Sequence, residues 1–133
     1  MKKHVRALAV VLMAGGIVAG GATTADAANK DGVINTGEFV QWYYTNYTGG
    51  CEDDYYADTS FWNDYFKNCG QGGSGVGAVV ANNTESDYNY DYTYRANPCT
   101  GTSYTGSCGT VQPRAGGNYN STYKNNVESL YWS

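Results

Sequence analysis

Four carboxylates lie close together after the first cysteine of the chain: Glu52, Asp53, Asp54 and Asp58. Glycoside hydrolases use two such groups, one as a general acid and one as a base or nucleophile, when a cleft holds them at a defined separation. Here the carboxylates crowd a polar segment flanked by glycines, which is more typical of a solvated face. We therefore expect an acidic surface and no enzyme, with a small secreted hydrolase as the weakest alternative.

The composition excludes several other classes of function. The only histidine, His4, lies in an N-terminal segment that we expect to be removed, so Ser-His-Asp and Cys-His nucleophiles and His-ligated zinc or haem have no basis. Eight basic residues stand against twelve acidic ones, for a net charge of -4. Binding to nucleic acid or to an anionic membrane surface needs clustered cations, so neither is an expected partner.

Residues 1–27 have the organisation of a signal peptide. Lys2, Lys3 and Arg6 precede an apolar stretch, and Ala25-Asp26-Ala27 is a typical cleavage site. The apolar stretch is too short to span a bilayer. We expect a secreted, extracellular and monomeric protein, with residues 28–133 forming a single domain.

Four cysteines in an exported domain indicate two disulfides. Three pairings are possible, and closure between near neighbours favours Cys51–Cys69 and Cys99–Cys108. A four-thiol zinc site is disfavoured because no two cysteines have the C-x2-4-C spacing.

The elements that would position these groups are strands. Ser86 to Tyr94 alternates small polar residues with tyrosines, which predicts a β-strand. Shorter strands are expected at 39–44, 76–81 and 127–132, a single helical turn at 62–66, and turns at 48–50, 70–77, 105–106 and 115–117. The fold class is all-β.

Aromatic residues must supply much of the core, because aliphatic residues are scarce while Tyr numbers 14 and Trp 3. We therefore interpret the alternating tyrosines as the buried face of a strand. An exposed platform for glycans or peptides is the alternative. The tyrosines in question are Tyr88, Tyr90, Tyr92 and Tyr94.

A weak internal repeat divides the domain. Asn82-Asn83-Thr84-Glu85-Ser86 matches Asn125-Asn126-Val127-Glu128-Ser129, and each pentad follows a Tyr-Thr-Gly corner, at Tyr47 and at Tyr104. The first half carries an insertion that contains Cys51 and Cys69. We expect two motifs, at about 31–87 and 88–133, that pack as two sheets.

Strand-like aromatics before a Tyr-x-Gly corner and an N-N-x-x-S pentad that closes each half resemble the βγ-crystallin Greek key. From Asp31 to Trp132 the chain is similar to the Streptomyces metalloproteinase-inhibitor family, which has that fold. Family members commonly carry two cysteines where this chain has Ile34 and Val40. The resemblance implies a Greek-key sandwich of two motifs stapled by disulfides, and a secreted inhibitor whose partner is a protease of the metalloprotease class.

The resemblance also implies an inhibitory loop, closed by Cys99 and Cys108, with Cys99–Thr100 as the bond presented to the protease. A short loop closed by a disulfide would enter an active site with little loss of conformational entropy. The expected loop residues are Pro98, Cys99, Thr100, Gly101, Tyr104 and Cys108.

The pentads resemble the calcium motif of microbial βγ-crystallins, although the final serine of that motif is replaced by Asp87 and Leu130. Calcium is the one cofactor considered, and oxygen ligands would suit it. The candidate ligands are Asn83, Ser86, Asn126 and Ser129. The alternative is that these side chains cap the corners by hydrogen bonds. Two further functions stay open beside inhibition: a calcium-binding crystallin-type structural protein and a killer-toxin-like antimicrobial.

Overall fold

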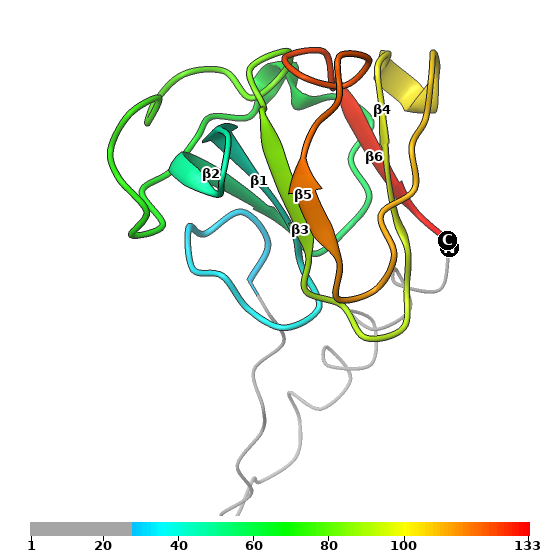
Figure 1. Ribbon diagram of the computed structural model, residues 1–133, viewed down its shortest axis with the longest axis horizontal. Coiled ribbons are helices and arrows are strands. Elements are labelled where there is room, and N and C mark those ends of the chain that lie inside the picture. The colour runs from blue at the N-terminus through cyan, green and yellow to red at the C-terminus, as the bar shows by residue number, and fades with distance from the viewer. Residues whose placement is uncertain (1–27) are drawn as a thin grey trace, which may run out of the picture.

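The computed structural model describes residues 28–133, and the signal-peptide prediction for 1–27 lies outside this range. Six strands and two short 3-10 turns make up the regular structure (Figure 1). In chain order these are β1 (Phe39–Tyr44), β2 (Thr48–Asp54), η2 (Phe61–Asn63), β3 (Ser86–Asn89), β4 (Ala96–Cys99), η3 (Thr102–Tyr104), β5 (Gly116–Asn118) and β6 (Ser129–Trp132). Within residues 28–133, no helix is long and apolar enough to cross a membrane.

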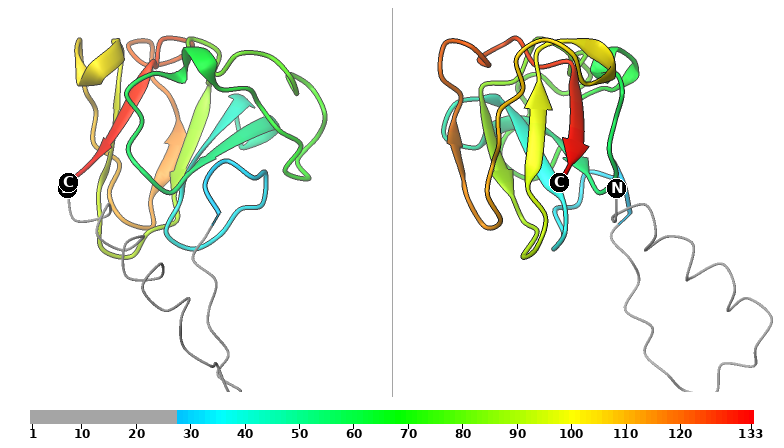
Figure 2. Two further views of the ribbon diagram at one scale, coloured as in Figure 1. Left: turned by 180° about the vertical axis from the view of Figure 1, so that it is seen from behind. Right: turned by 90° about the vertical axis from the view of Figure 1, so that its right-hand side faces the viewer.

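The strands form two antiparallel sheets that face each other, as the side view of Figure 2 shows. The first sheet has the order β2-β1-β3-β5, and the second pairs β4 with β6. Isolated bridges extend the second sheet on both sides: Asp58 pairs with Leu130 of β6, and Val111 pairs with Ala96 of β4. The all-β prediction is confirmed.

The two halves exchange one segment each. β5, from the second half, pairs with β3 in the first sheet, while Asp58, from the first half, pairs with β6 in the second sheet. Each sheet therefore contains backbone from both halves, so neither half can complete its sheet alone. The motif boundary expected at about residue 87 lies within β3 and stays a prediction.

Side chains from both sheets form the main core between them. Phe39 of β1 packs edge-to-face on Trp132 of β6, with ring centroids 6.5 Å apart. The buried members of this core are Phe39, Phe61, Phe66, Val80, Ala81, Ala96, Val127, Leu130 and Trp132. A second, smaller cluster of Val40, Trp42 and Cys51 lies on the opposite face of the first sheet, because side chains along β1 and β2 alternate between faces.

Four of the sequence-based expectations for the elements are wrong. The turn expected at 115–117 contains the beginning of β5 at Gly116, and the strand expected from Ser86 to Tyr94 ends at Asn89. Thr48-Gly49-Gly50 is the beginning of β2 rather than a turn, and the four-residue run that follows it, Cys51 to Asp54, completes that strand. Residues 76–81 form turns with an isolated bridge at Val79 rather than a strand. Glycine is rare inside strands, so Gly49 and Gly50 made this segment look like a turn. Gly50 is needed there because a Cβ at this position would lie 2.8 Å from the Phe66 Cβ.

Both predicted disulfides, Cys51–Cys69 and Cys99–Cys108, are present. Cys51–Cys69 fastens the inserted segment to β2, and Cys99–Cys108 joins β4 to the strand-like segment beside it.

Candidate functional site

The acidic residues of β2 are buried, so the expectation of a solvated face is wrong. Glu52, Asp53 and Asp54 are exposed by 3 %, 0 % and 0 %. The strand alternation sends Glu52 and Asp54 to the inner face of the first sheet and Asp53 to the outer face. These three consecutive acidic residues therefore lie on opposite faces of the sheet and have different neighbours.

On the inner face, one lysine meets four carboxylates; we call this set of residues the Lys30 cluster. The Lys30 ammonium donates hydrogen bonds to Asp58 and, at 2.7 Å, to Asp64. Its Nζ lies 3.3 Å from Glu52 Oε1 and 3.7 Å from Asp54 Oδ1. The cluster stands where the edge strand β2 meets the Asp58 segment, at the open side of the sandwich.

Burial governs the protonation of the cluster. Burial alone lowers the pKa of Lys30, but the charges of Asp54 and Glu52 outweigh it, and the Lys30 pKa lies above its ordinary value. Burial raises the pKa of Glu52 to about 8, although the charge of Lys30 opposes this rise. Burial, reinforced by Glu52, raises the pKa of Asp54 well above its ordinary value. One ammonium is thus too little positive charge for these carboxylates.

On the outer face, Asp53 holds the N-terminal segment against β2. Its carboxylate accepts hydrogen bonds of 2.9 Å from the backbone N–H groups of Asp31 and Gly32. The nearby Glu38 accepts a 2.5 Å bond from the Asn35 N–H. Burial raises the pKa of Glu38 to about 7 and that of Asp53 to about 6. These carboxylates have a structural use as turn caps.

The expected inhibitory loop does not present the Cys99–Thr100 bond. Pro98 and Cys99 are buried residues of β4, where they pair with Leu130 and Ser129 of β6. A protease cleft could not reach that bond in this conformation. The carbonyl oxygen of Pro98 accepts a 2.9 Å bond from the Gly109 N–H, and proline, which has no N–H, returns none, so the ladder has one bond fewer at this point.

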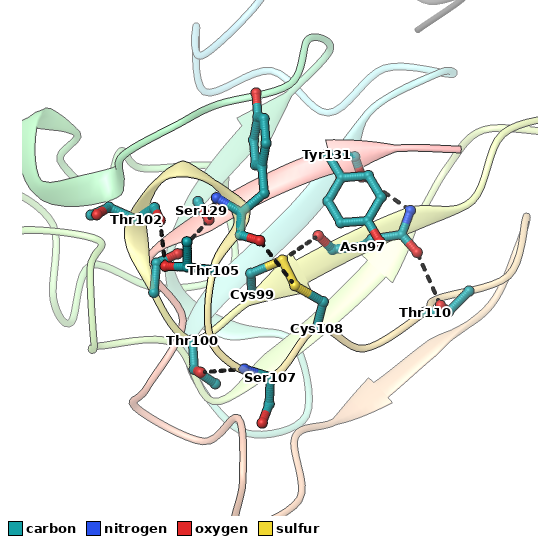
Figure 3. Close-up of a disulfide and its surroundings, with 12 residues drawn as sticks. Asn97, Cys99, Thr100, Thr102, Thr105, Ser107, Cys108, Thr110, Ser129 and Tyr131 are labelled. Atoms are coloured by element: carbon teal, nitrogen blue, oxygen red, sulfur yellow. Dashed lines mark hydrogen bonds between the residues drawn. A yellow bond between two sulfur atoms is a disulfide. The ribbon is translucent and has the colours of Figure 1, made fainter.

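The exposed part of the loop is its tip, which is fastened to the body (Figure 3). The Ser129 hydroxyl donates a 2.6 Å bond to the carbonyl oxygen of Gly101 and accepts a 3.1 Å bond from the Tyr104 N–H. The Ser103 N–H donates to the carbonyl oxygen of Thr59. Cys108 is exposed while Cys99 is fully buried, so the disulfide ties the tip to the interior of the second sheet.

The first half repeats this corner. The Ser86 hydroxyl donates to the carbonyl oxygen of Tyr44 at 2.7 Å and accepts from the Tyr47 N–H at 3.1 Å. Tyr47 and Tyr104 both have left-handed backbones, with φ of 60° and 62°. The two pentad serines therefore act as clamps on equivalent tyrosine corners.

The pentad asparagines connect the two halves. Asn82 Nδ2 donates to Glu128 Oε1 at 2.8 Å, and Asn125 Nδ2 donates to Glu85 Oε1 at 3.2 Å. The backbone repeats the exchange, because the Asn82 N–H donates to Val127 and the Asn125 N–H donates to Thr84. Each pentad thus binds the other reciprocally.

The remaining candidate calcium ligands are engaged in local bonds. Asn83 donates to the carbonyl oxygens of Val79 and Ala81, and Asn126 donates to that of Thr122. These contacts are the corner-capping arrangement that the sequence offered as the alternative. Calcium binding at Asn83, Ser86, Asn126 and Ser129 stays a prediction.

The tyrosine alternation has the opposite phase to the one expected. Asp87 and Asn89 are the buried residues on the inner face of β3, whereas Tyr88 and Tyr90 lie on the outer face and Tyr92 is 69 % exposed. The guanidinium of Arg114 lies 4.7 Å from the Tyr92 ring centroid and within 6 Å of the other two rings. Tyr92 is exposed, so the interpretation as a buried face is wrong there. Tyr88 and Tyr90 are half-buried against the smaller cluster of Val40, Trp42 and Cys51, and Tyr94 packs on the main core.

Solved structures share this architecture. A structure from work on the evolution of the eye-lens βγ-crystallin domain fold matches 82 % of this chain and 93 % of its own, with a TM-score of 0.58 and 12 % identity. The fold is that of a βγ-crystallin domain. The N-terminal domain of Protein S matches 72 % of this chain and 94 % of its own, with a TM-score of 0.53 and 14 % identity. No family model and no curated protein matches the sequence.

The sequence did not indicate the two partners that complete the Lys30 cluster, Lys30 and Asp64. They are distant along the chain from Glu52 and Asp54, and no local motif joins them. Correct assignment of β2 as a strand could have revealed that Glu52 and Asp54 share a face, which Asp53 does not.

Proposed function

We propose that the protein is a non-enzymatic structural protein of the βγ-crystallin type, secreted from the cell. The observation that carries this proposal is the reciprocal bonding of the two pentads. Polar groups that could serve a reaction or a ligand are used instead to fasten the two motifs: Asn82 to Glu128, Asn125 to Glu85, and each pentad serine to its own corner. Two disulfides support an oxidising, extracellular setting.

Exchange of one segment between the motifs supports the same proposal. A chain whose sheets both contain backbone from both halves must break the pairing of β3 with β5 and of Asp58 with Leu130 before either half can open. Such interlocking favours long-lived persistence outside the cell, where no chaperone renews the fold.

Peptidase inhibition is the second candidate function, and the rigid tip of the Cys99–Cys108 loop favours it. Residues 102–103 and 105–108 of the tip are exposed, and the Ser129 hydroxyl and the disulfide restrain them. A pre-ordered tip would lose little entropy in a protease cleft. In this version of the hypothesis the contacted bond lies between Thr102 and Ser107 rather than at Cys99–Thr100.

One mixing experiment separates the two functions. The oxidised chain is incubated in equimolar amounts with a thermolysin-like protease, and both partners are followed. The structural proposal predicts an intact chain by mass spectrometry and an undiminished rate of cleavage of a small chromogenic substrate. Stoichiometric loss of that rate would establish inhibition and overturn the proposal.

A further inference from the structure

The Lys30 cluster carries more negative charge than its lysine can balance. Glu52, Asp54, Asp58 and Asp64 surround a single ammonium, and Glu52 and Asp54 are 3 % and 0 % exposed. Buried carboxylates are costly unless they are paired, protonated or bound to a cation. The arrangement therefore calls for positive charge beyond Lys30.

The hydrogen bonds of Lys30 go to the less buried half of the cluster. Its ammonium donates to Asp58 and Asp64. Within residues 28–133 no group donates a hydrogen bond to the carboxylate oxygens of Glu52 or Asp54, which Lys30 reaches only as an ion pair, at 3.3 Å and 3.7 Å. These oxygens are buried, converge on the ammonium and retain free lone pairs, which is the condition of metal ligands.

The spacing of the oxygens suits a hard cation. One oxygen each from Glu52, Asp54 and Asp58 lie within 4.8 Å of one another. Ligands about 2.3–2.6 Å from a calcium ion can be separated by up to roughly 5 Å across its coordination shell. A pocket of about 150 Å³ adjoins the cluster and gives room for water ligands and for an ion; its lining includes Glu52 and Asp64 but also a second lysine, Lys67.

Lys30 can leave this position without unfolding the chain. Its side chain is 22 % exposed, so the flexible stem can turn toward solvent. Its backbone is fixed separately, because the Lys30 N–H donates a 2.7 Å bond to the carbonyl oxygen of Asp53 on the edge of β2. The ammonium is therefore a tethered cation that another cation can replace.

We propose that Glu52, Asp54 and Asp58, assisted by Asp64, form a binding site for a divalent cation of the calcium class, and that the ammonium of Lys30 competes with the ion for it. The site is distinct from the pentads, where the sequence suggested calcium. It does not depend on the structural function proposed above. Removal of the Lys30 charge should convert a weak site into a strong one.

The experiment uses the oxidised protein and its Lys30→Met variant, which keeps the length of the side chain and removes the charge. Calcium chloride is titrated calorimetrically at neutral pH and fixed ionic strength. We expect Lys30→Met to bind one calcium ion per chain at least about tenfold more tightly than the wild type, since a nearby unit charge opposes the ion. Lys124→Met, a matched loss of charge at an exposed lysine beside Glu85, should bind as the wild type does.

Second-site variants locate the ion. In the Lys30→Met background, Glu52→Gln should abolish binding, whereas Asn126→Ala in the second pentad should leave it unchanged. The reverse pattern would overturn the proposal. So would the absence of binding of calcium, magnesium and manganese by Lys30→Met, which would show that protons alone neutralise the cluster.

A folding readout covers the case in which Lys30→Met is unfolded in chelator. Recovery of the native circular dichroism spectrum on addition of calcium chloride, but not of sodium chloride at equal ionic strength, is then the expected result. Failure of every divalent cation to restore the fold would contradict the proposal.

Discussion

Asn82 Nδ2 donates a 2.8 Å hydrogen bond to Oε1 of Glu128, and Asn125 Nδ2 donates a 3.2 Å bond to Oε1 of Glu85. The pairs occupy the same positions in the two pentads with donor and acceptor exchanged between motifs. They differ in exposure, since the first pair is partly buried and the second is exposed. The two copies of the repeated pentad therefore bind each other and connect the two motifs.

A double-mutant cycle measures the strength of that connection. We expect Asn82→Ala and Glu128→Ala to show a coupling of about 1–2 kcal/mol in the free energy of unfolding, because the bond is charge-assisted and partly shielded from water. The exposed pair, Asn125→Ala with Glu85→Ala, should couple by less than about 0.5 kcal/mol. Equal couplings would show that burial does not distinguish the two ends.

The serine clamps provide a second test by denaturant unfolding. Ser86→Ala and Ser129→Ala should each cost about 1–3 kcal/mol, because a backbone carbonyl and a backbone N–H lose the buried hydroxyl that both of them contact. Ser107→Ala, an exposed serine of the same loop, should change the free energy of unfolding by less than about 0.5 kcal/mol. A neutral Ser129→Ala would refute the clamp.

Two adjacent glycines test the exchange of β5. A Cβ on Gly116 would lie against the carbonyl oxygen of Asp87 and 2.6 Å from the Cα of Tyr88, whereas nothing lies within 4 Å of a Cβ on Gly117. Gly116→Ala should therefore separate β5 from β3 and lower the melting temperature strongly. Gly117→Ala should leave the melting temperature nearly unchanged, and equal effects of the two substitutions would contradict the observed register.

Stability should fall as the pH rises, and Asp87 should account for part of the change. Burial raises the pKa of Asp87 to about 7, despite hydrogen bonds with Tyr119 and Gly117 that lower it. Between the ordinary carboxyl pKa near 4 and this value, the folded protein holds a proton that the unfolded chain releases, so the free energy of unfolding decreases with pH. The contribution is on the order of 1–4 kcal/mol.

The variant Asp87→Asn isolates that contribution. It removes one titrating group and should make the fall in stability between pH 5 and pH 8 less steep, as followed by denaturant midpoints; the buried carboxylates Glu38, Glu52 and Asp53 account for the rest. A wild-type protein whose stability rises through this range, or a variant with an unchanged slope, would be inconsistent with a protonated Asp87.

The sequence predicted β1 and the disulfides whose cysteines are near neighbours, whereas the β-branched run at 76–81 forms turns despite its β-propensity. β1 was expected at its observed bounds because Phe39 to Tyr44 is rich in aromatic and β-branched residues. β2 was missed because its first residues, Thr48-Gly49-Gly50, have the composition of a turn. Gly49 and Gly50 are needed there by the close approach of Ser74 and Phe66, which are distant in the sequence.

The candidate site was harder to predict because alternation gives the period of a strand but not its phase. In β3 the tyrosines were expected inside, yet Asp87 and Asn89 occupy the interior. Asn89 there donates to the carbonyl oxygens of Tyr94 and Val111, bonds that no local pattern foretells. Which face of β3 is buried depends on such partners, which are distant in the sequence. The pairing of Lys30 with Glu52 and Asp54 is likewise a contact between residues distant in the sequence.

Native-state hydrogen exchange tests most directly whether the pentads fasten the motifs into one cooperative unit. The Asn82 N–H donates to the carbonyl oxygen of Val127 and the Asn125 N–H to that of Thr84. Each amide therefore reports on the contact between the two pentads, one from each motif. The account predicts that both amides exchange with the same free energy, equal to that of global unfolding. Free energies that differ by more than about 1 kcal/mol, with one motif opening while the other stays protected, would contradict it.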